Sequence, residues 1–462
     1  MLAAKNATNN INVVSTAYIP NGMTVHFQTA FGLGDLPTIH WGTAANDLCN
    51  TATGYTTTYD RTPPCSIAMT TMCSQFFHNV LLQNLTPSTT YYYSIMASNG
   101  TTASPTLNFT TAKAAGDSSG FTIAVLNDMG YTNAQGTHQY LKQVADSGAA
   151  FAWHGGDISY ADDWFDGILA CQEGEVCYNG SDSYLHNTPP APFPPEYNIP
   201  VPEGEIPDQG GPQGGDANPI YEVNWDIWQQ WMEPIFMKLP YMVLPGNHEA
   251  ACGEFDGPGN ITTAYLNNNI TNGTAPESDL TYYSCPPSQR NFTTFQHRFR
   301  MPGNETGGVS NFWYSFDYGN AHFISLDGET DFPYSPEYPF VRDITGNETL
   351  PTEQQTYITD SGPFGYINGS WKDNESYEQL AWLADDLAAV NRTETPWVFA
   401  MTHRPMYSSQ VSSYETNVRN AFEPIMLHYG VDVSTQTFSH HLDKLILTKY
   451  GAGLLRWPHP LV

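Results

Sequence analysis

Four short segments of the sequence carry residue types that can hold metal ions, and each follows an apolar run typical of a β-strand. In chain order they are Asp128-Met129-Gly130, Gly156-Asp157-Ile158-Ser159-Tyr160, Gly246-Asn247-His248-Glu249 and Ala400-Met401-Thr402-His403. Carboxylate, amide and imidazole groups are ligands that metal cations bind readily. Because open α/β sheets place their sites at the carboxyl ends of strands, we expect the four segments to meet in one metal site.

Two of these segments are weak signals by themselves. An Asp-x-Gly such as the one at Asp128 is more often a turn than a metal site, although Gly130 lets the backbone turn tightly beside a ligand. A single histidine such as His403 is more often a satisfied core residue, although a neutral imidazole suits a divalent ion. The prediction therefore depends on the conjunction of all four segments.

The other two segments are more specific. Asp157 can bridge two cations, and Gly156 allows a close approach of the backbone. Tyr160 can ligate only a strongly Lewis-acidic ion, because its pKa of about 10 must be overcome; read alone, this segment fits a strand end followed by a core tyrosine equally well. Asn247 supplies an amide oxygen without adding charge, whereas His248 can face the substrate as a phosphate hydrogen-bond donor or as the acid for the leaving group.

The charge balance excludes some partners. The 462 residues include 16 Lys and Arg against 46 Asp and Glu, which gives a net charge of −30 and a pI of about 4.5. Nucleic acids and anionic membranes normally bind clustered Lys and Arg, and no run approaches the roughly 18 apolar residues of a membrane span. We therefore expect a small-molecule ligand, no nucleic acid and no membrane; the oligomeric state stays open.

Asn-x-Ser/Thr sequons are dense along the chain and predict a secreted, glycosylated protein. The seven cysteines agree with an oxidising compartment, and Cys171 with Cys177 and Cys252 with Cys285 are plausible disulfides. The opening residues show no signal-peptide pattern, so secretion is inferred from the sequons and cysteines. The predicted glycosylation sites are Asn84, Asn99, Asn108, Asn179, Asn260, Asn291, Asn347 and Asn391.

The pattern of elements changes near residue 113. Residues 1–112 contain short alternating runs separated by Pro, Gly and Asn, which predicts a small β-sandwich, and 113–120 is a linker by composition. From residue 121, strand-like and helix-like runs alternate, as in a layered α/β domain. Strands are expected at 121–127, 150–154, 241–244, 397–401 and 431–433, helices at 137–145, 221–239, 377–390 and 417–427, a hairpin at 312–326, and irregular surface insertions at 171–219 and 254–308.

Taken together, the motifs resemble those of the purple acid phosphatases, within the calcineurin-like metallophosphoesterases. The stretches GGDISYADDW (Gly155–Trp164) and THRPMYSS (Thr402–Ser409) are similar to the long fungal and plant-type members. The resemblance covers roughly residues 10–433. It implies an α/β protein in which a fibronectin type III-like β-sandwich precedes a metallophosphoesterase α/β/β/α sandwich.

The resemblance also implies a cofactor. A ferric ion would be held by Asp128, Asp157 and Tyr160, and a divalent ion (iron, zinc or manganese) by Asp157, Asn247 and His403. In the family, a metal-bound hydroxide attacks phosphorus in line while two cations about 3.5–4 Å apart offset the developing charge. The bond between tyrosinate and ferric iron gives such enzymes their colour, so Tyr160 is a testable marker.

The implied activity is that of a secreted acid phosphatase, which hydrolyses phosphate monoesters. By this resemblance His248 helps to bind phosphate and protonates the leaving alkoxide. Asn247 and Glu249 also contact the substrate, and Glu249 tunes the histidine. The physiological ester is left open by the sequence.

The resemblance ends after Val433. The family pattern then gives a short strand and a GHxH element whose histidines complete the two metal sites, whereas His440 and His441 are adjacent here and would point to opposite faces of an extended segment. A shifted reading frame, a retained intron or an altered splice would explain such a tail. We therefore expect a catalytic domain over 121–433 that lacks its C-terminal part, an atypical tail over 434–462, an exposed sheet edge and little or no activity.

Two other functions remain open at this point. A phosphodiesterase on the same scaffold is possible, because loops decide the substrate, although Tyr160 favours a ferric centre over a Zn/Zn or Mn/Mn centre. A non-catalytic secreted glycoprotein would keep the fold without the chemistry. A visible absorption band from a tyrosinate–iron centre would distinguish the enzyme from the latter.

Overall fold

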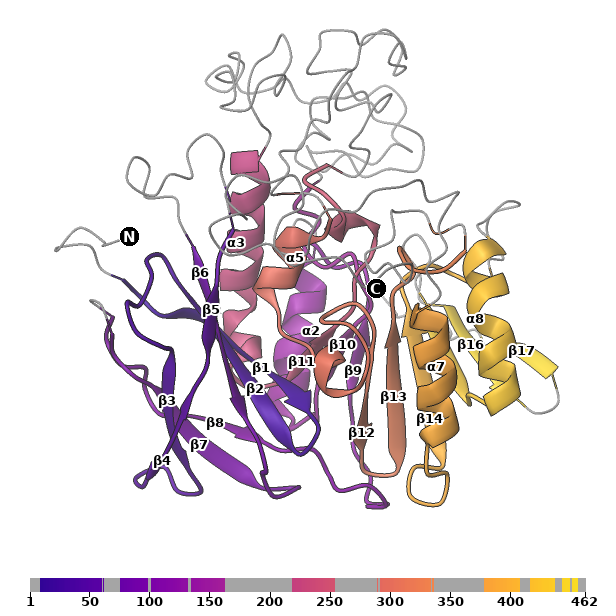
Figure 1. The fold of residues 1–462 in the computed structure, drawn as a ribbon, viewed down its shortest axis with the longest axis horizontal. Coiled ribbons are helices and arrows are strands. Elements are labelled where there is room, and N and C mark those ends of the chain that lie inside the picture. Colours follow the sequence, from indigo (N-terminus) through magenta and orange to yellow (C-terminus); the bar gives the residue numbers. More distant parts are fainter. Residues whose placement is uncertain are drawn as a thin grey trace, which may run out of the picture.

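The computed structural model describes most of the two predicted domains (Figure 1). All structural statements below concern these described residues. They are 9–59, 61, 75–98, 101–131, 134–162, 218–253, 289, 291–333, 335, 378–407, 416–436, 443–448 and 451–455.

The N-terminal module is a sandwich of two four-stranded antiparallel sheets, as predicted. Alternate residues of its second strand, Met23, Val25 and Phe27, lie on one face and are fully buried. The opposite face is buried as well, because Gln28 donates to Gln229 of the catalytic domain (3.0 Å). The sheets run β1 (Asn12–Ile19), β2 (Gly22–Thr29), β6 (Phe76–Leu82), β5 (Tyr55–Thr57) and β4 (Asn50–Thr53), β3 (Thr38–Gly42), β7 (Thr90–Ile95), β8 (Leu107–Thr110).

The catalytic domain contains a parallel three-stranded sheet and a mixed six-stranded sheet. Helices α2 (Gln135–Asp146) and α3 (Asn218–Phe236) lie beside the first sheet, and α7 (Glu378–Ala389) and α8 (Thr416–Tyr429) beside the second (Figure 1). This is the predicted α/β/β/α layering. The sheets run β11 (Tyr241–Val243), β10 (Ala152–His154), β9 (Ala124–Leu126) and β12 (Tyr314–Tyr318), β13 (Ala321–Leu326), β14 (Trp397–Thr402), β15 (Val433–Gln436), β16 (Asp443–Thr448), β17 (Gly451–Leu455).

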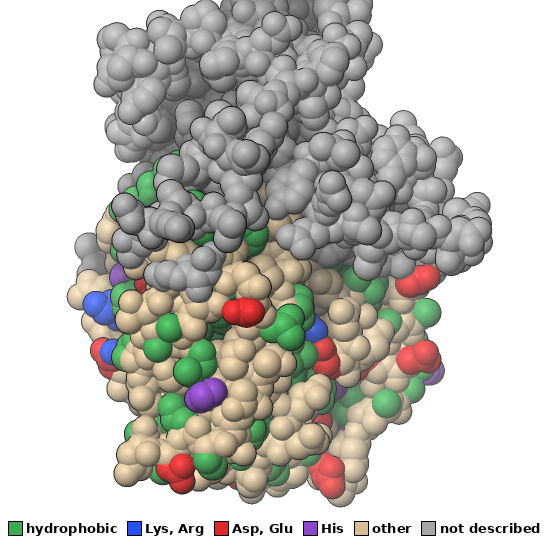
Figure 2. Space-filling model, turned by 60° about the vertical axis from the view of Figure 1, so that its left-hand side comes forward, with side chains coloured by type: hydrophobic (Ala, Val, Ile, Leu, Met, Phe, Trp, Pro, Cys, Tyr) green, Lys and Arg blue, Asp and Glu red, His purple; other side chains and the backbone are tan. Residues whose placement is uncertain are grey.

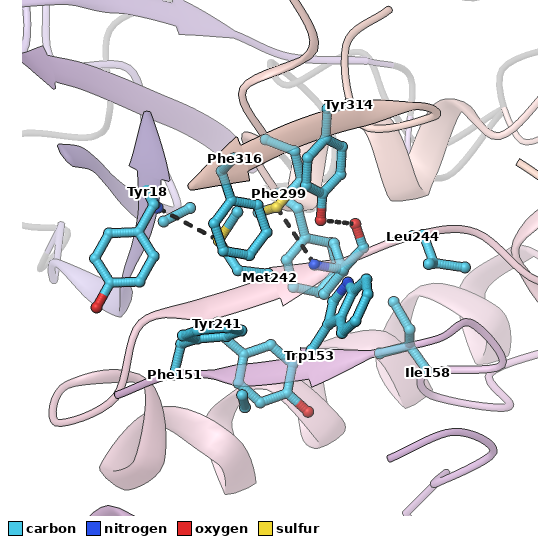
Figure 3. Close-up of a cluster of buried hydrophobic side chains, with 14 of the residues drawn as sticks. Tyr18, Phe151, Trp153, Ile158, Tyr241, Met242, Leu244, Phe299, Tyr314 and Phe316 are labelled. Carbon is cyan, nitrogen blue, oxygen red and sulfur yellow. Dashed lines mark hydrogen bonds between the residues drawn. The ribbon is translucent and has the colours of Figure 1, made fainter. Parts of the chain in front are cut away.

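The core between the two sheets is largely aromatic (Figure 3). Trp153 of β10 meets Phe323 of β13 edge to face at 5.3 Å between ring centroids, and its indole N–H donates to Ser325 (2.9 Å). The hydroxyl of Tyr314 on β12 donates to the carbonyl of Val243 on β11 (2.7 Å). Buried polar groups of these aromatic residues therefore have partners on the facing sheet, which fixes the sheets relative to each other.

The N-terminal module packs directly into this core. The ring of Tyr18 on β1 contacts Phe151, Phe316 and Tyr318, and its hydroxyl donates to the carbonyl of Ala150 (2.9 Å). Residues from both domains thus share one hydrophobic cluster, in which Tyr18 is visible at the left of Figure 3.

Most predicted elements are present, but the expected insertion at 254–308 is wrong in its second half. Helix α5 (Thr293–Arg298) lies there, followed by the short 3-10 helix η4 (Gly303–Glu305), and all six residues of α5 are buried. Its charged end, Arg298, is paired with carboxylates of α3, which permits its burial. The first expected insertion, up to residue 217, and Cys171, Cys177 and Cys285 lie outside the described residues, and helix α3 begins at Asn218. Cys49 is a free exposed thiol and Cys252 is disulfide-bonded.

The sheet also continues beyond Val433, contrary to the expectation of missing final strands. Strand β15 pairs in parallel with β14, and β16 and β17 add antiparallel strands to it. The run Lys444–Thr448 contains Ile446 and Thr448, β-branched residues that favour strand formation. The edge of the described sheet is therefore β17, not β15.

On the face shown in Figure 2, Lys and Arg side chains are scattered among polar and apolar ones. Within the described residues, no helix combines the length and the apolar character needed to cross a membrane.

A buried histidine links the second sheet to its covering helix. His322 of β13 contacts Asp317 of β12 (2.7 Å) and Asp386 of α7 (2.9 Å). Burial disfavours the charged ring, but the two carboxylates outweigh that effect and raise the pKa of His322 to about 9. The charged histidine therefore stabilises the contact between sheet and helix.

We predict that His322→Gln removes a pH-dependent part of the stability. Because the folded pKa exceeds the unfolded value of about 6.5, the stabilisation is complete below pH 6.5 and is lost as the pH rises through about 9. It amounts to at most about 3 kcal/mol. Thermal unfolding from pH 5 to 9.5 measures it: the gap between wild type and variant should close toward pH 9.5, and a constant gap would contradict the assignment.

Candidate metal centre

The four predicted segments meet at one edge of the two sheets. Strands β9, β10 and β11 are parallel, so the loops that carry Asp128, Asp157 and Asn247 leave the sheet at the same end. His403 follows β14 of the second sheet. The nearest ligand atoms of Asp128, Asp157 and His403 all lie within 4.8 Å of one another.

The other expected ligands lie around the same point. Nε2 of His403 is 3.1 Å from Oδ2 of Asp157 and 3.1 Å from Oδ1 of Asn247. The hydroxyl of Tyr160 is 3.3 Å from Oδ2 of Asp157. All five side chains that the sequence predicted as metal ligands are therefore brought together.

The orientation of His403 leaves its Nε2 free for a cation. Its Nδ1 lies 2.9 Å from the carbonyl oxygen of Gly155, which can only accept, so Nδ1 carries a hydrogen. The lone pair of Nε2 then points at the oxygens of Asp157 and Asn247. Such facing lone pairs repel unless a proton or a cation lies between them, so the donor set fits a metal ion.

The electrostatics of the cluster support the same conclusion. Burial would lower the pKa of His403, but the carboxylates of Asp157, Asp128 and Glu329 raise it to about 10. Burial would raise the pKa of Asp157, yet His403 and His248 hold it well below its usual range. The buried carboxylates thus create a negative electrostatic potential, which favours the binding of a cation.

Three of the candidate ligands are placed by an unusual backbone. Asp128, Asp157 and Tyr160 adopt positive φ values of 48°, 50° and 48°, a region that is strained for residues with a Cβ atom. The loops that carry them are also hydrogen-bonded to each other, from the amide of Asp128 to Gly156 (3.2 Å) and from Met129 to Asp157 (3.0 Å). This pairing compensates for the strain and fixes the ligand positions.

Glu249 connects two of the loops that carry candidate metal ligands. Its carboxylate accepts from the amides of Asp157, Ile158 and Gly246, each at 2.8 Å, and it is fully buried. Burial first, and then the charge of Asp157, raises the pKa of Glu249 to about 8. Its carboxylate therefore faces backbone amides, which differs from the expected contact with substrate.

His248 faces the centre and is oriented by a residue that the sequence reasoning missed. Its Nδ1 is 3.0 Å from both carboxylate oxygens of Asp162, which is fully buried, and its Nε2 lies 3.7 Å from Oδ2 of Asp157. The ring also packs on Tyr160, with 4.2 Å between centroids. The available signal was the acidic residue two positions after Tyr160.

Comparison with known proteins agrees with this geometry. Residues 8–111 match the purple acid phosphatase N-terminal domain and 203–441 the calcineurin-like phosphoesterase domain. The chain is 62% identical to an acid phosphatase of Aspergillus ficuum, covering 96% of this chain and 72% of that one, and 30% identical to acid phosphatase A of Cryphonectria parasitica, covering 88% and 70%. A purple acid phosphatase from yellow lupin shares the fold (TM-score 0.56, 19% identity, 95% of this chain and 60% of that one).

The fold and the site thus define a calcineurin-like metallophosphoesterase. Within that class, the chain belongs to the purple acid phosphatase family and is a phosphatase, and the family implies a dinuclear metal centre. The high identity over 96% of the chain gives no support to the expected loss of activity. His440 and His441 lie outside the described residues.

We predict that Gly156→Ala disrupts the metal centre. A Cβ at Gly156 would lie 2.6 Å from the amide nitrogen of Gly246 and 2.8 Å from Nδ1 of His403, so these ligand-bearing segments would be forced apart. Gly148 is a matched control, because its φ of 81° is also left-handed but an added Cβ meets nothing within 4 Å.

In both alanine variants the free energy of unfolding should fall by about 1–2 kcal/mol, because a Cβ atom strains the left-handed backbone. Only Gly156→Ala should also lose bound metal, measured by elemental analysis of the purified protein. Equal metal content in the two variants would show that the close approach at Gly156 is not required.

Proposed function

We propose that the chain hydrolyses phosphate monoesters at a dinuclear centre of Fe(III) and a divalent ion, namely iron, zinc or manganese. The convergence of Asp128, Asp157, Tyr160, Asn247 and His403 carries this proposal. The shared position of Asp157 supports its role as the bridging ligand. The phenol of Tyr160 beside Asp157 favours a ferric ion, because phenolate ligation needs a strong Lewis acid.

When bound, the two cations would activate a water molecule and offset the charge that develops on the phosphoryl group. The residues of the chain supply the remaining requirements. Asn247 contributes an uncharged amide oxygen as a ligand, and His248 directs Nε2 toward the centre while Asp162 holds Nδ1. This orientation suits His248 to bind the phosphate and to give a proton to the leaving oxygen.

We also propose that the protein is secreted and glycosylated. Asn84, Asn108 and Asn391 are exposed, as an acceptor for a glycan must be, and Asn291 is partly exposed. The disulfide bond at Cys252 supports an oxidising compartment. Asn99, Asn179, Asn260 and Asn347 lie outside the described residues.

Tyr160→Phe should abolish the visible absorption of the iron-loaded protein, because no phenolate would remain to donate charge to the ferric ion. The absorption spectrum of the purified protein measures this directly. Tyr140→Phe is the control, since Tyr140 is exposed on α2, and it should leave the spectrum unchanged. A colourless wild-type protein with two bound metals would contradict the assignment of Fe(III) to Tyr160.

His248→Asn should lower kcat by about 10²–10⁴-fold for alkyl phosphates, whose leaving oxygen needs a proton. The loss should be much smaller for 4-nitrophenyl phosphate, because nitrophenolate leaves without protonation. Asp162→Asn should show the same dependence on leaving group with a smaller loss. The exposed His428→Asn is the control; an equal loss with both esters would rule out His248 as the acid.

A further inference from the structure

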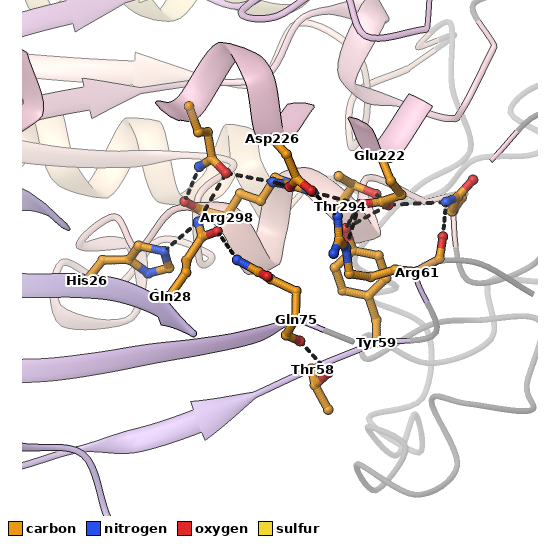
Figure 4. A network of polar contacts seen from close by, with 12 residues as sticks. His26, Gln28, Thr58, Tyr59, Arg61, Gln75, Glu222, Asp226, Thr294 and Arg298 are labelled. Atoms are coloured by element: carbon orange, nitrogen blue, oxygen red, sulfur yellow. Dashed lines mark hydrogen bonds and ion pairs between the residues drawn. The ribbon is translucent and has the colours of Figure 1, made fainter. Parts of the chain in front are cut away.

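A buried cluster of charges joins the N-terminal module to helix α3 (Figure 4). Arg61 of the module contacts Glu222 through Nε (2.9 Å) and Asp226 through Nη2 (2.6 Å). Arg298 of α5 contacts the same two carboxylates at 2.6 and 2.9 Å. Two guanidinium groups from different segments therefore hold one face of α3.

Glu222 is the centre of this cluster. It also accepts hydrogen bonds from Tyr59 of the module (2.8 Å), from Gln289 (3.1 Å) and from Thr294 of α5 (3.3 Å). Its side chain is 1% exposed. Removal of one cationic partner would leave a buried carboxylate without full compensation, so the cluster has a strong preference for this single arrangement.

The opposite face of α3 reaches the active-site loop. Glu222 and Asp226 are four residues apart and share one face of the helix, whereas Asn224 lies midway between them and points away from that face. Nδ2 of Asn224 donates to the carbonyl oxygen of Ala161 (3.2 Å), which is fully buried. Ala161 directly precedes Asp162, the carboxylate that orients His248.

We propose that Arg61 is a positioning residue for the active site, because it fixes α3 through Glu222 and Asp226 and α3 in turn fixes the loop at Ala161. The N-terminal module thereby takes part in catalysis without touching substrate. This inference rests on the proposed role of His248. The chain of contacts from Arg61 to Asp162 is short: helix α3 alone lies between Arg61 and Asn224, and Ala161 and Asp162 are joined by one peptide bond.

Catalysis is sensitive to small displacements of the groups in the active site. A misplacement of about 1 Å at a catalytic group can lower the rate roughly 100-fold. The bond between Asp162 and His248 is near its optimal length, so a small displacement of Ala161 would weaken it. We expect Arg61→Met to lower kcat roughly tenfold with little change in KM, since the metal ligands and the phosphate contacts remain.

Arg300→Met provides the matched control. Arg300 is also a buried arginine at the module interface, where its Nε donates to Tyr55 (2.9 Å) and its Nη1 contacts Glu305 (3.0 Å). Both variants should therefore unfold at lower temperatures than wild type. Only Arg61→Met should change kcat when both are assayed well below their unfolding temperatures.

Hydrogen exchange gives a readout that is independent of turnover. In Arg61→Met, the amides of residues 157–162 should exchange at least several-fold faster than in wild type, whereas Arg300→Met should leave them unchanged. Equal exchange and equal kcat in the two variants would overturn the proposal, because Arg61 would then only stabilise the interface.

A double-mutant cycle tests the route through α3. If the effect of Arg61 passes through Asn224, the double variant Arg61→Met/Asn224→Ala should have about the same kcat as the less active of the two single variants. Multiplicative losses would overturn this route. His248→Asn separates the two proposals: if it keeps full activity with alkyl phosphates, the proposed function fails, while the exchange experiment still decides whether Arg61 holds the loop.

Discussion

The carboxylate of Glu249 accepts hydrogen bonds from amides on two different loops, and the geometry of the metal centre depends on this contact. It ties Asp157 and Ile158 to Gly246, so the loops after β10 and β11 cannot separate. A charged group buried beside Asp157 is unfavourable by itself, and the three amides only partly offset that cost. Burial and the charge of Asp157 raise the pKa of Glu249 to about 8, so below that pH Glu249 holds the loops together without adding a negative charge. The negative charge that would attract a cation then comes from the candidate ligands Asp128 and Asp157.

The three-stranded sheet that carries most of the candidate ligands is too small to be stable by itself. A parallel sheet needs cover on both faces, and here the six-stranded sheet supplies one cover and α3 contributes to the other. Because the N-terminal module buries β1 and β2 against α3 and inserts Tyr18 into the shared core, it completes this cover. The module is thus part of the scaffold that holds the loops of the candidate metal centre, rather than a separate domain attached to it.

The sequence predicted the features that depend on neighbouring residues, and it missed the contacts between residues far apart in the chain. Ligands at strand ends, such as Asp157, were visible because an apolar run stops at a polar residue beside glycine. The sequence did not reveal the partners of Arg61, because Glu222 and Asp226 are more than 160 residues away. Charged residues on a helix also normally face solvent. Helix α5 was hidden for a related reason: its burial depends on pairing Arg298, which no periodicity reveals.

The module interface also limits the pH range in which the scaffold holds. Burial lowers the pKa of His26 to about 4 and those of His78 and His297 to about 3, and the fixed charge of Arg298 adds to the effect on His26 and His297. The unfolded chain, with a histidine pKa of about 6.5, takes up these protons first, so stability falls as the pH drops from about 6.5 toward 3. His322 does not add to this loss, because its stabilisation is already complete below pH 6.5 and stays constant there. His26 contacts Gln28, which bonds Gln229 of α3, and His297 of α5 contacts Thr57 of the module. Protonation of these two histidines should therefore weaken the contact between the module and the catalytic domain as the pH falls.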